Sequence, residues 1–238
     1  MHDTQDDTLF PRRIRSFVKR AGRMTPSQQQ ALDNLWPTYG LQLSAGKLDF
    51  ADLFGNDNPV IMEIGFGMGD SLITMAQTMP ENNYLGIEVH QPGVGRLLNN
   101  AHLGELTNLK VFADDAIEVM AQCIPDHSLA GVQLFFPDPW HKKKHNKRRI
   151  VQAKFAQDIR QKLVAGGIFH MATDWQPYAE HMLEVMEAAP GYSNQAGPGE
   201  YSPQPDFRPV TKFQKRGEGK GHGVWDLIYQ TIDAGTQK

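Results

Sequence analysis

The sequence predicts one α/β domain built on a doubly wound, mostly parallel sheet of seven strands. The first reason is an alternation of short apolar runs with helical segments, which begins at Pro59 and is typical of parallel sheets. The second is size, because 238 residues with 40% hydrophobic composition suffice for one such core and a short appendage. The third is a glycine-rich turn after the first strand of the series. We therefore expect a flexible basic N-terminal arm over residues 1–23 and a single domain over residues 24–238.

The expected elements follow from local signals along the chain. Thr25 and Pro26 are residue types that cap and open helices, so a helix is expected over residues 27–36. Gly166-Gly167 is typical of a turn from a helix into a strand, and the last strand should be antiparallel and at an edge of the sheet. The expected strands cover residues 60–64, 83–89, 108–113, 130–136, 166–173 and 224–232, and the expected helices cover residues 70–79, 92–103, 115–122, 150–163 and 175–188.

Positive charge is clustered in a chain whose formal net charge is −3. Nucleic-acid binding would therefore have to use local patches rather than an overall basic surface. The three basic clusters are Arg12, Arg13, Arg15, Lys19, Arg20 and Arg23; Lys142, Lys143, Lys144, Lys147, Arg148 and Arg149; and Arg208, Lys212, Lys215, Arg216 and Lys220. Such runs are also typical of solvated faces, so the clusters alone do not decide the partner.

Two observations constrain the cellular location. A single cysteine, Cys123, excludes an internal disulfide and fits a reducing compartment. The acidic, polar first residues are unlike a secretory signal, and no apolar run approaches the length that crosses a membrane. We expect a cytoplasmic protein that does not bind membranes.

The segment from Leu134 to Lys143 is the most informative in the chain. An apolar run typical of a buried strand ends in Pro137-Asp138-Pro139-Trp140, and the second basic cluster follows directly. Proline fixes its own φ and restricts the residue before it. Asp138 is therefore presented stiffly at the carboxyl edge of the sheet, where α/β proteins bind ligands. An acid and an aromatic ring beside a polycation indicate a nucleobase held next to its own phosphates.

The first strand of the series leads into a turn with the sequence Glu63-Ile64-Gly65-Phe66-Gly67-Met68-Gly69. Glycines in such a turn let the backbone approach a ligand closely. A dinucleotide fingerprint would place its third glycine where this chain has Asp70. A carboxylate there would occupy the helix N-terminus that otherwise binds a pyrophosphate, which argues against NAD.

Two further acids follow strand ends. Glu88 ends the second strand of the series and can accept hydrogen bonds from a ribose diol. Asp115 follows the third strand and can take the amino group of an adenine, although it can equally cap the next helix. Together with the glycine turn, these acids describe a pocket for an adenosine without phosphates.

The glycine turn and the strand-end acids resemble the class I S-adenosylmethionine-dependent methyltransferases. A more specific resemblance, to the bacterial tRNA (guanine-N7)-methyltransferases, rests on several short motifs and covers nearly the whole chain from Arg12 on. One departure is Gln214, which stands where that family often has glutamate. The motifs are Arg12-Arg13-Ile14-Arg15-Ser16-Phe17, Phe136-Pro137-Asp138-Pro139-Trp140-His141-Lys142, Lys147-Arg148-Arg149, Ala172-Thr173-Asp174-Trp175, Thr211-Lys212-Phe213 and Gly221-His222-Gly223-Val224-Trp225-Asp226-Leu227.

This resemblance implies methylation of the variable-loop guanine at tRNA position 46, with S-adenosylmethionine as the methyl donor and Asp138 as the catalytic residue. The implied cofactor-binding residues are Glu63, Gly65, Gly67, Glu88, Asp115 and Asp138. The implied substrate-binding residues are Lys142, Asp174, Thr211, Lys212, Phe213 and Gln214. The implied RNA-binding residues are Lys144, His145, Asn146, Lys147, Arg148 and Arg149, with Arg12, Arg13 and Arg15 of the arm.

The sequence also bears on metals, protein partners and rival functions. No metal is expected, because His141 and His145 have no cysteine or carboxylate at ligand spacing and lie among cations. No obligate protein partner is expected, and the chain should act as a monomer, with a homodimer as the alternative. Two other functions remain open, an NAD-dependent oxidoreductase and a non-catalytic RNA-binding module on the same fold. The missing third glycine counts against the first, and the intact strand-end acids count against the second.

Overall fold

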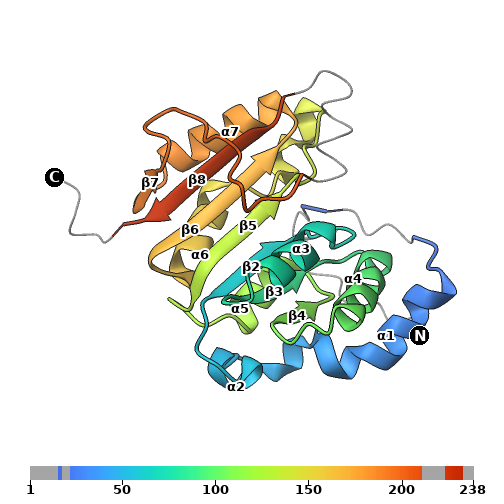
Figure 1. Cartoon of the computed structure of the whole chain (residues 1–238). Coiled ribbons are helices and arrows are strands. Elements are labelled where there is room, and N and C mark those ends of the chain that lie inside the picture. The colour runs from blue at the N-terminus through green and yellow to red at the C-terminus, as the bar shows by residue number, and fades with distance from the viewer. Residues whose placement is uncertain (1–15, 18–21, 211–222, 233–238) are drawn as a thin grey trace, which may run out of the picture.

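The computed structural model describes residues 16–17, 22–210 and 223–232, which form an eight-stranded sheet with helices on both faces (Figure 1). The helices are α1 (Pro26–Tyr39), η1 (Leu43–Ala45), α2 (Phe50–Phe54), α3 (Asp70–Thr78), α4 (Gln91–Leu103), α5 (Ala116–Gln122), η2 (Lys143–Arg148), α6 (Ala153–Lys162) and α7 (Gln176–Glu187), where η marks a 3-10 helix. The strands are β1 (Gly40–Leu41), β2 (Val60–Ile64), β3 (Asn83–Ile87), β4 (Leu109–Phe112), β5 (Leu129–Phe135), β6 (Leu163–Thr173), β7 (Tyr192–Asn194) and β8 (Trp225–Thr231).

The strand order places a reversal of winding at the centre of the sheet. The order is β1-β4-β3-β2-β5-β6-β8-β7, in which only β8 and β7 pair antiparallel to their neighbours. The chain winds outward from β2 to β4 and then returns to β5, which lies on the other side of β2. In doubly wound sheets, ligands bind at the carboxyl ends of the strands that flank such a reversal. The fold expected from the sequence is confirmed.

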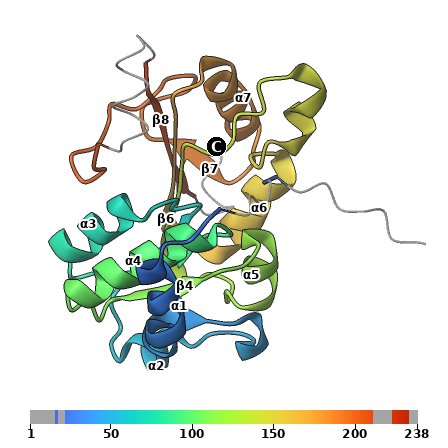
Figure 2. The same ribbon diagram turned by 90° about the vertical axis from the view of Figure 1, so that its right-hand side faces the viewer.

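Two apolar cores sandwich the sheet. Figure 2 shows α3 and α4 on one side and α5 and α6 on the other. Met62 and Ile64 of β2 belong to the core on the α5–α7 side, together with Phe169. Leu72 and Leu97 belong to the core on the α3–α4 side. Because side chains alternate along a strand, Glu63 points to the α3–α4 side, where the glycine turn also lies.

Several element bounds differ from the expectation. The sheet has eight strands rather than seven: besides the six located from the sequence, it includes the two-residue β1, which pairs with β4, and the three-residue β7, which pairs with β8. The first helix has the expected cap, since Thr25 and Gln28 form a capping box, but it continues through Pro37 to Tyr39. The helix expected from residue 150 begins only at Ala153, because the basic run before it forms η2.

The C-terminal strands also differ from the expectation. The expectation of an edge position for the last strand was wrong, because β7 pairs along the outer side of β8. Strand β6 begins at Leu163, where Leu129 of β5 pairs with it, and an irregular stretch follows before Ile168 pairs with Gly131. Gly166 lies in this stretch with φ 76°, so the expected turn is a bulge within the strand. No helix within the described ranges is long and apolar enough to cross a membrane.

Candidate functional site at the carboxyl edge of the sheet

A cavity of about 410 Å³ opens at the carboxyl ends of β2, β3, β4 and β5. This volume falls in the range of about 300–1,000 Å³ that is usual for sites of small molecules and cofactors. The cavity wall contains all six residues that the resemblance assigns to the cofactor: Glu63, Gly65, Gly67, Glu88, Asp115 and Asp138. The topology therefore brings the strand-end acids together, although up to 75 positions separate them along the chain, from 63 to 138.

The glycine turn after β2 requires its glycines. Gly65, Gly67 and Gly69 have φ angles of 75°, 59° and 78°, which are left-handed values that residues with a side chain rarely adopt. The start of α4 packs directly on this turn, since a Cβ on Gly93 would lie 1.9 Å from the Gly67 carbonyl oxygen. The backbone thus forms a smooth wall along one side of the cavity.

Glu88 connects the turn to the end of β3. One carboxylate oxygen accepts a hydrogen bond from the backbone N–H of Gly67 at 2.8 Å. The other accepts from the N–H groups of Val89 at 2.7 Å and His90 at 2.9 Å. A carboxylate offers about four acceptor positions, so this acid is fixed in place and still has capacity for a ligand hydroxyl.

Glu63 is the buried acid of the cavity. Its side chain is only 2% exposed, and its Oε2 has no hydrogen-bond partner among the described residues. Burial, with a smaller effect of the nearby Glu88, raises the pKa of the Glu63 carboxyl to about 8. A carboxyl group in this state is a ready partner for a cationic group that enters the cavity.

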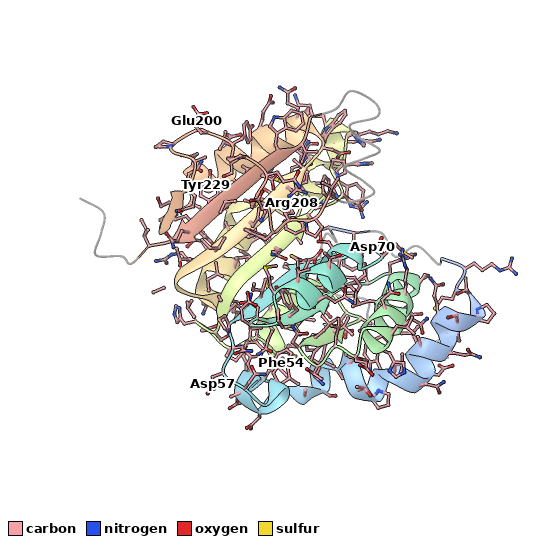
Figure 3. The ribbon with its side chains drawn as sticks, viewed as in Figure 1. Phe54, Asp57, Asp70, Glu200, Arg208 and Tyr229 are labelled. Atoms are coloured by element: carbon pink, nitrogen blue, oxygen red, sulfur yellow. The ribbon has the colours of Figure 1, made fainter. Side chains whose placement is uncertain are left out.

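Two more acids lie on the wall beside the helices. Asp115 caps α5, because its carboxylate accepts from the Ile117 N–H at 3.0 Å, and it also faces the cavity. Both interpretations of this residue from the sequence are therefore compatible. Asp70 is the first residue of α3 and forms an ion pair with Arg96 of α4. A carboxylate occupies the helix N-terminus, as the sequence indicates, and Figure 3 shows it at the tip of α3.

The turn after β5 is bracketed by two unusual residues. Phe136 and Trp140 have φ angles of 50° and 49°, which are rare for aromatic side chains and cost of order 1–3 kcal/mol each. Between them, the prolines hold Asp138 with its side chain exposed at the cavity wall. No donor from the described part of the chain forms a hydrogen bond to its carboxylate.

The described fragment of the N-terminal arm contacts this turn. Ser16 and Phe17 form part of the cavity wall. The Trp140 indole N–H donates to the Ser16 carbonyl at 3.0 Å. Arg148 lies with its guanidinium carbon 3.8 Å from the Trp140 ring centroid and donates to the Phe17 carbonyl at 3.5 Å. Arg12, Arg13 and Arg15 lie outside the described residues.

The basic run after the turn is not one uniform surface. Lys142, Lys144 and Lys147 are exposed, and no carboxylate of a described residue forms an ion pair with them. His145, Asn146 and Arg148 are half-buried, and His145 contacts the Trp140 ring edge-to-face. Arg149 is buried at 5% exposure. The residues of the run that were expected to bind RNA thus lie in three different environments: exposed, half-buried and buried.

The remaining substrate residues are only partly described. Asp174 follows the end of β6, next to β5 in the sheet, and is half-buried with no hydrogen-bond donor to it among the described residues. Thr211, Lys212, Phe213 and Gln214 lie outside the described residues.

One polar cluster was not found from the sequence. Arg208 donates from Nε and Nη2 to the two oxygens of Asp226, at 2.7 Å each, and His170 Nε2 lies 2.7 Å from the same carboxylate. All three side chains are buried. Burial lowers the pKa of His170, and the hydrogen bonds from His170 and Arg208 hold the pKa of Asp226 below its ordinary value although burial opposes this. Figure 3 shows Arg208 over the β6–β8 half of the sheet.

The placement of Arg208 corrects the reading of the third basic cluster, because this member of it is a core residue rather than a surface cation. Its guanidinium carbon lies 5.8 Å from the ring centroids of Phe135 and Phe136. The buried polar cluster thus packs against the end of β5. The only available signal in the sequence was the pair of an isolated acid in β8 and a histidine in β6, which is too common to interpret. Among the described residues, no group of three or more metal-ligating side chains comes together.

Comparison with known proteins identifies the class. A family model described as "Putative methyltransferase" matches residues 57–227. The solved structure of the 16S rRNA methyltransferase KamB superposes with a TM-score of 0.55 at 12% identity, covering 90% of this chain and 97% of that one. An S-adenosylmethionine-dependent O-methyltransferase from Thermotoga maritima gives a TM-score of 0.50 at 13% identity, with 92% and 70% covered. The family model identifies the chain as a methyltransferase, and the two solved structures show the fold that it shares with them.

Closer relatives identify the family. A tRNA (guanine-N(7)-)-methyltransferase of Aeromonas hydrophila subsp. hydrophila is 58% identical over 228 residues, which is 96% of both chains. One from Vibrio cholerae serotype O1 is 60% identical over 228 residues, 95% of both chains. The chain belongs to the tRNA (guanine-N(7)-)-methyltransferase family. It is therefore an enzyme, the family expected from the sequence motifs is confirmed, and the two rival functions fall away.

The cavity fits the cofactor of this class. S-adenosylmethionine carries a ribose diol, an adenine amino group, a cationic sulfonium and a methionyl end with an ammonium and a carboxylate, and no phosphate. Glu88 keeps acceptor capacity for hydroxyls, Asp115 faces the same space, and Glu63 has a buried oxygen without a partner. The carboxylate of Asp70 at the start of α3 would repel a pyrophosphate. The donor and acceptor set thus matches an adenosine attached to a cation.

Proposed function

We propose that this protein transfers a methyl group from S-adenosylmethionine to N7 of the guanine at position 46 in the variable loop of tRNA. The observation that supports it most strongly is the meeting of two sets of residues in one cavity. One set, the cofactor half, comprises residues 63–70, Glu88 and Asp115. The other, the base half, comprises residues 136–140 and Asp174, of which residues 136–138 line the cavity. The relatives named above carry the activity in their names.

The chemistry requires little beyond alignment and charge. Guanine N7 carries an in-plane lone pair and no proton, so no general base is needed. The sulfonium of the cofactor supplies an activated methyl group. The protein has to hold donor and acceptor in line and to stabilise the positive charge that develops on the base. An exposed carboxylate at the cavity wall, without a competing donor from the described residues, meets this need, and Asp138 is that carboxylate.

Each acid of the cofactor half would contact a different part of the cofactor. Glu88 would accept hydrogen bonds from the ribose hydroxyls, and Asp115 would accept from the adenine amino group. Glu63 would take the ammonium of the methionyl end, which would convert its raised-pKa carboxyl into a paired carboxylate. Gly65 and Gly67 let the backbone lie against the ligand, because their left-handed φ angles exclude side chains.

The residues of the base half and the basic run would hold the RNA. Asp138 would accept from the guanine N1–H and amino group, and Asp174 would hold the base or its ribose. Lys142 and the segment from Thr211 to Gln214 would complete this contact. Lys144 and Lys147 would bind backbone phosphates, which position the RNA without reading its sequence. Arg12, Arg13 and Arg15 of the arm would add a second phosphate contact, and His145, Asn146 and Arg148 would also contact the RNA.

Transfer of labelled methyl groups to unmodified tRNA transcripts tests this proposal. A transcript with guanine at position 46 should accept one methyl group, and a matched transcript with adenine at that position should accept none. Equal transfer to both would show that another nucleotide is the target, and no transfer to either would refute the activity.

Three expectations about organisation belong to the same proposal. Residues 1–23 would be a basic arm, and residues 24–238 would fold as one domain. The enzyme would act as a monomer without an obligate protein partner. Light scattering of the free protein and of its tRNA complex tests the last point, since a homodimer would double the mass of the free protein.

A further inference from the structure

Arg149 ends the basic run, but its side chain lies inside the protein. It is 5% exposed, whereas Lys144 and Lys147 of the same run are exposed. Arg149 directly follows the short helix η2 and is its C-cap residue. A guanidinium in this position has little open face toward a phosphate.

The guanidinium is held by the protein through two hydrogen bonds and one ring contact. Its Nε donates to the Pro139 carbonyl at 3.0 Å, and its Nη1 donates to the Pro177 carbonyl at 3.1 Å. Its central carbon lies 4.8 Å from the centroid of the Tyr178 ring, which provides a cation–π contact for the buried charge. Burial lowers the pKa of Arg149, but a guanidinium remains charged at any physiological pH.

The two carbonyls lie close in sequence to the two acids of the base half. Pro139 follows Asp138 directly, and Pro177 lies in the first turn of α7, three positions after Asp174. Arg149 therefore bridges the turn that carries Asp138 and the start of the helix that follows Asp174. The Tyr178 phenol interacts electrostatically with both Arg149 and Asp138. Burial raises the pKa of Tyr178, the charge of Arg149 lowers it and the charge of Asp138 raises it further.

The turn around Asp138 depends on such external support. Phe136 and Trp140 hold left-handed φ angles, and residues in this state persist only where the surroundings impose them. At the first end of the turn, the Phe136 N–H donates to the Ala172 carbonyl at 2.8 Å. At the other end, the Pro139 carbonyl accepts from Arg149.

From this geometry we propose that Arg149 is a positioning residue, which sets the place of the Asp138 carboxylate and does not bind RNA phosphate. The proposal rests on the methyl-transfer function proposed above. It separates Arg149 from Lys144 and Lys147, with which the sequence groups it. A phosphate contact would have to use the small part of the guanidinium that stays exposed, or the side chain would have to leave both carbonyls and the Tyr178 ring.

The test compares Arg149→Ala and Arg149→Lys with the matched control Lys147→Ala. Three quantities are measured for each: the single-turnover rate of methyl transfer at saturating tRNA and cofactor, the tRNA Kd over a salt titration, and the Kd of S-adenosylhomocysteine by calorimetry. For Arg149→Ala we expect the rate to fall about 10²-fold, as for a misplaced catalytic group, with tRNA affinity and salt slope unchanged. Lys147→Ala should weaken tRNA binding and reduce the salt slope by about one unit or less.

The lysine variant separates the two roles even if the alanine variant is poorly folded. Lysine keeps the charge but not the planar fork that serves two carbonyls, so the Arg149→Lys rate should stay low. A phosphate contact would tolerate lysine as a cation. The proposal is overturned if Arg149→Lys has a wild-type rate, or if either Arg149 variant loses tRNA affinity and salt slope while its saturated rate is unchanged. An unchanged Kd for S-adenosylhomocysteine shows that the cofactor half is intact, and an inactive wild-type protein would refute the proposed function rather than this inference.

Discussion

The cofactor half and the base half of the site are built in different ways. In the cofactor half, the protein itself fixes the acids: Glu88 accepts three backbone N–H groups, and Asp115 caps α5. In the base half, Asp138 and Asp174 accept no hydrogen bond from a described residue, and the turn around Asp138 is bracketed by two left-handed aromatic residues. Hydrogen bonds within the protein thus hold the acids of the cofactor half in place. The acids of the base half remain able to accept hydrogen bonds from a guanine.

The largest expected effect is in the base half. Asp138→Asn keeps the shape of the side chain but removes its charge and half of its acceptor capacity. We expect turnover to fall about 10²-fold or more, because one preorganised electrostatic contact in the transition state is lost. The Kd of S-adenosylhomocysteine should change far less. Steady-state kinetics with tRNA, paired with calorimetry, measures both.

The control for this substitution is Asp57→Asn, an exposed acid before β2 at the opposite edge of the sheet (Figure 3). It should leave both quantities unchanged. If Asp138→Asn turns over at nearly the wild-type rate, Asp138 is only a turn residue, and its carboxylate does not contribute to catalysis.

The next effect is in the cofactor half. Glu88→Ala removes the acceptor of three backbone N–H groups and of the proposed ribose contact. We expect the binding free energy of S-adenosylhomocysteine to weaken by about 1–3 kcal/mol, the usual cost when buried partners are left unsatisfied. Calorimetry is the direct measurement. Glu81 is an exposed acid just before the first residue of β3, and Glu81→Ala is the matched control. Equal affinity for Glu88→Ala and wild type would move the ribose contact to another residue.

Glu63 is the exception that sharpens the comparison, because it lies in the cofactor half without a partner for its buried oxygen. With a pKa of about 8 in the free protein, its carboxyl is mostly protonated at pH 7. If the methionyl ammonium pairs with it, binding releases close to one proton, and affinity rises with pH up to about 8. Calorimetry of S-adenosylhomocysteine in two buffers of different ionisation enthalpy detects the proton.

The same pKa has a consequence for stability. A carboxyl whose pKa is higher in the folded than in the unfolded state makes the free protein less stable as pH rises from about 4.5 to about 8. Glu63→Gln should abolish both the proton release and this part of the pH dependence. A heat of binding that is independent of the buffer would exclude the proposed ion pair.

The smallest expected effect concerns the exposed lysines beside the base half. Lys144→Ala and Lys147→Ala should each weaken tRNA binding and reduce the slope of log K against log salt by about one unit or less. The Kd of S-adenosylhomocysteine should not change. Lys154→Ala, on the exposed face of α6, is the control. If the lysine variants match wild type at every salt concentration, the run is only a solvated face and the arm with Arg12, Arg13 and Arg15 becomes the better candidate.

The cofactor half could be predicted from the sequence because its signals are local and the topology does the rest. The glycines of the turn are required by left-handed φ angles, and Glu88 and Asp115 follow strands whose carboxyl ends meet at one edge. Parallel strands with alternating helices allow few arrangements, so the order around β2 and β5 was also predictable.

The base half could be predicted only in part. The sequence shows Asp138 between two prolines, but neither the left-handed Phe136 and Trp140 nor the inward direction of Arg149 leaves a signal. A run of cations looks uniform, whereas its members differ in burial. The buried pair of Arg208 and Asp226 joins positions 18 residues apart that carry no common pattern. Short elements such as β1 and β7 have too few residues for periodicity.

Nucleoside analysis of tRNA after incubation with the enzyme and labelled S-adenosylmethionine tests the central claim most directly. The claim is that the site methylates a nitrogen that carries no proton, using an acid and no general base. The label should appear in 7-methylguanosine. Label in another methylated nucleoside alone, or no transfer in the presence of both ligands, would contradict the account.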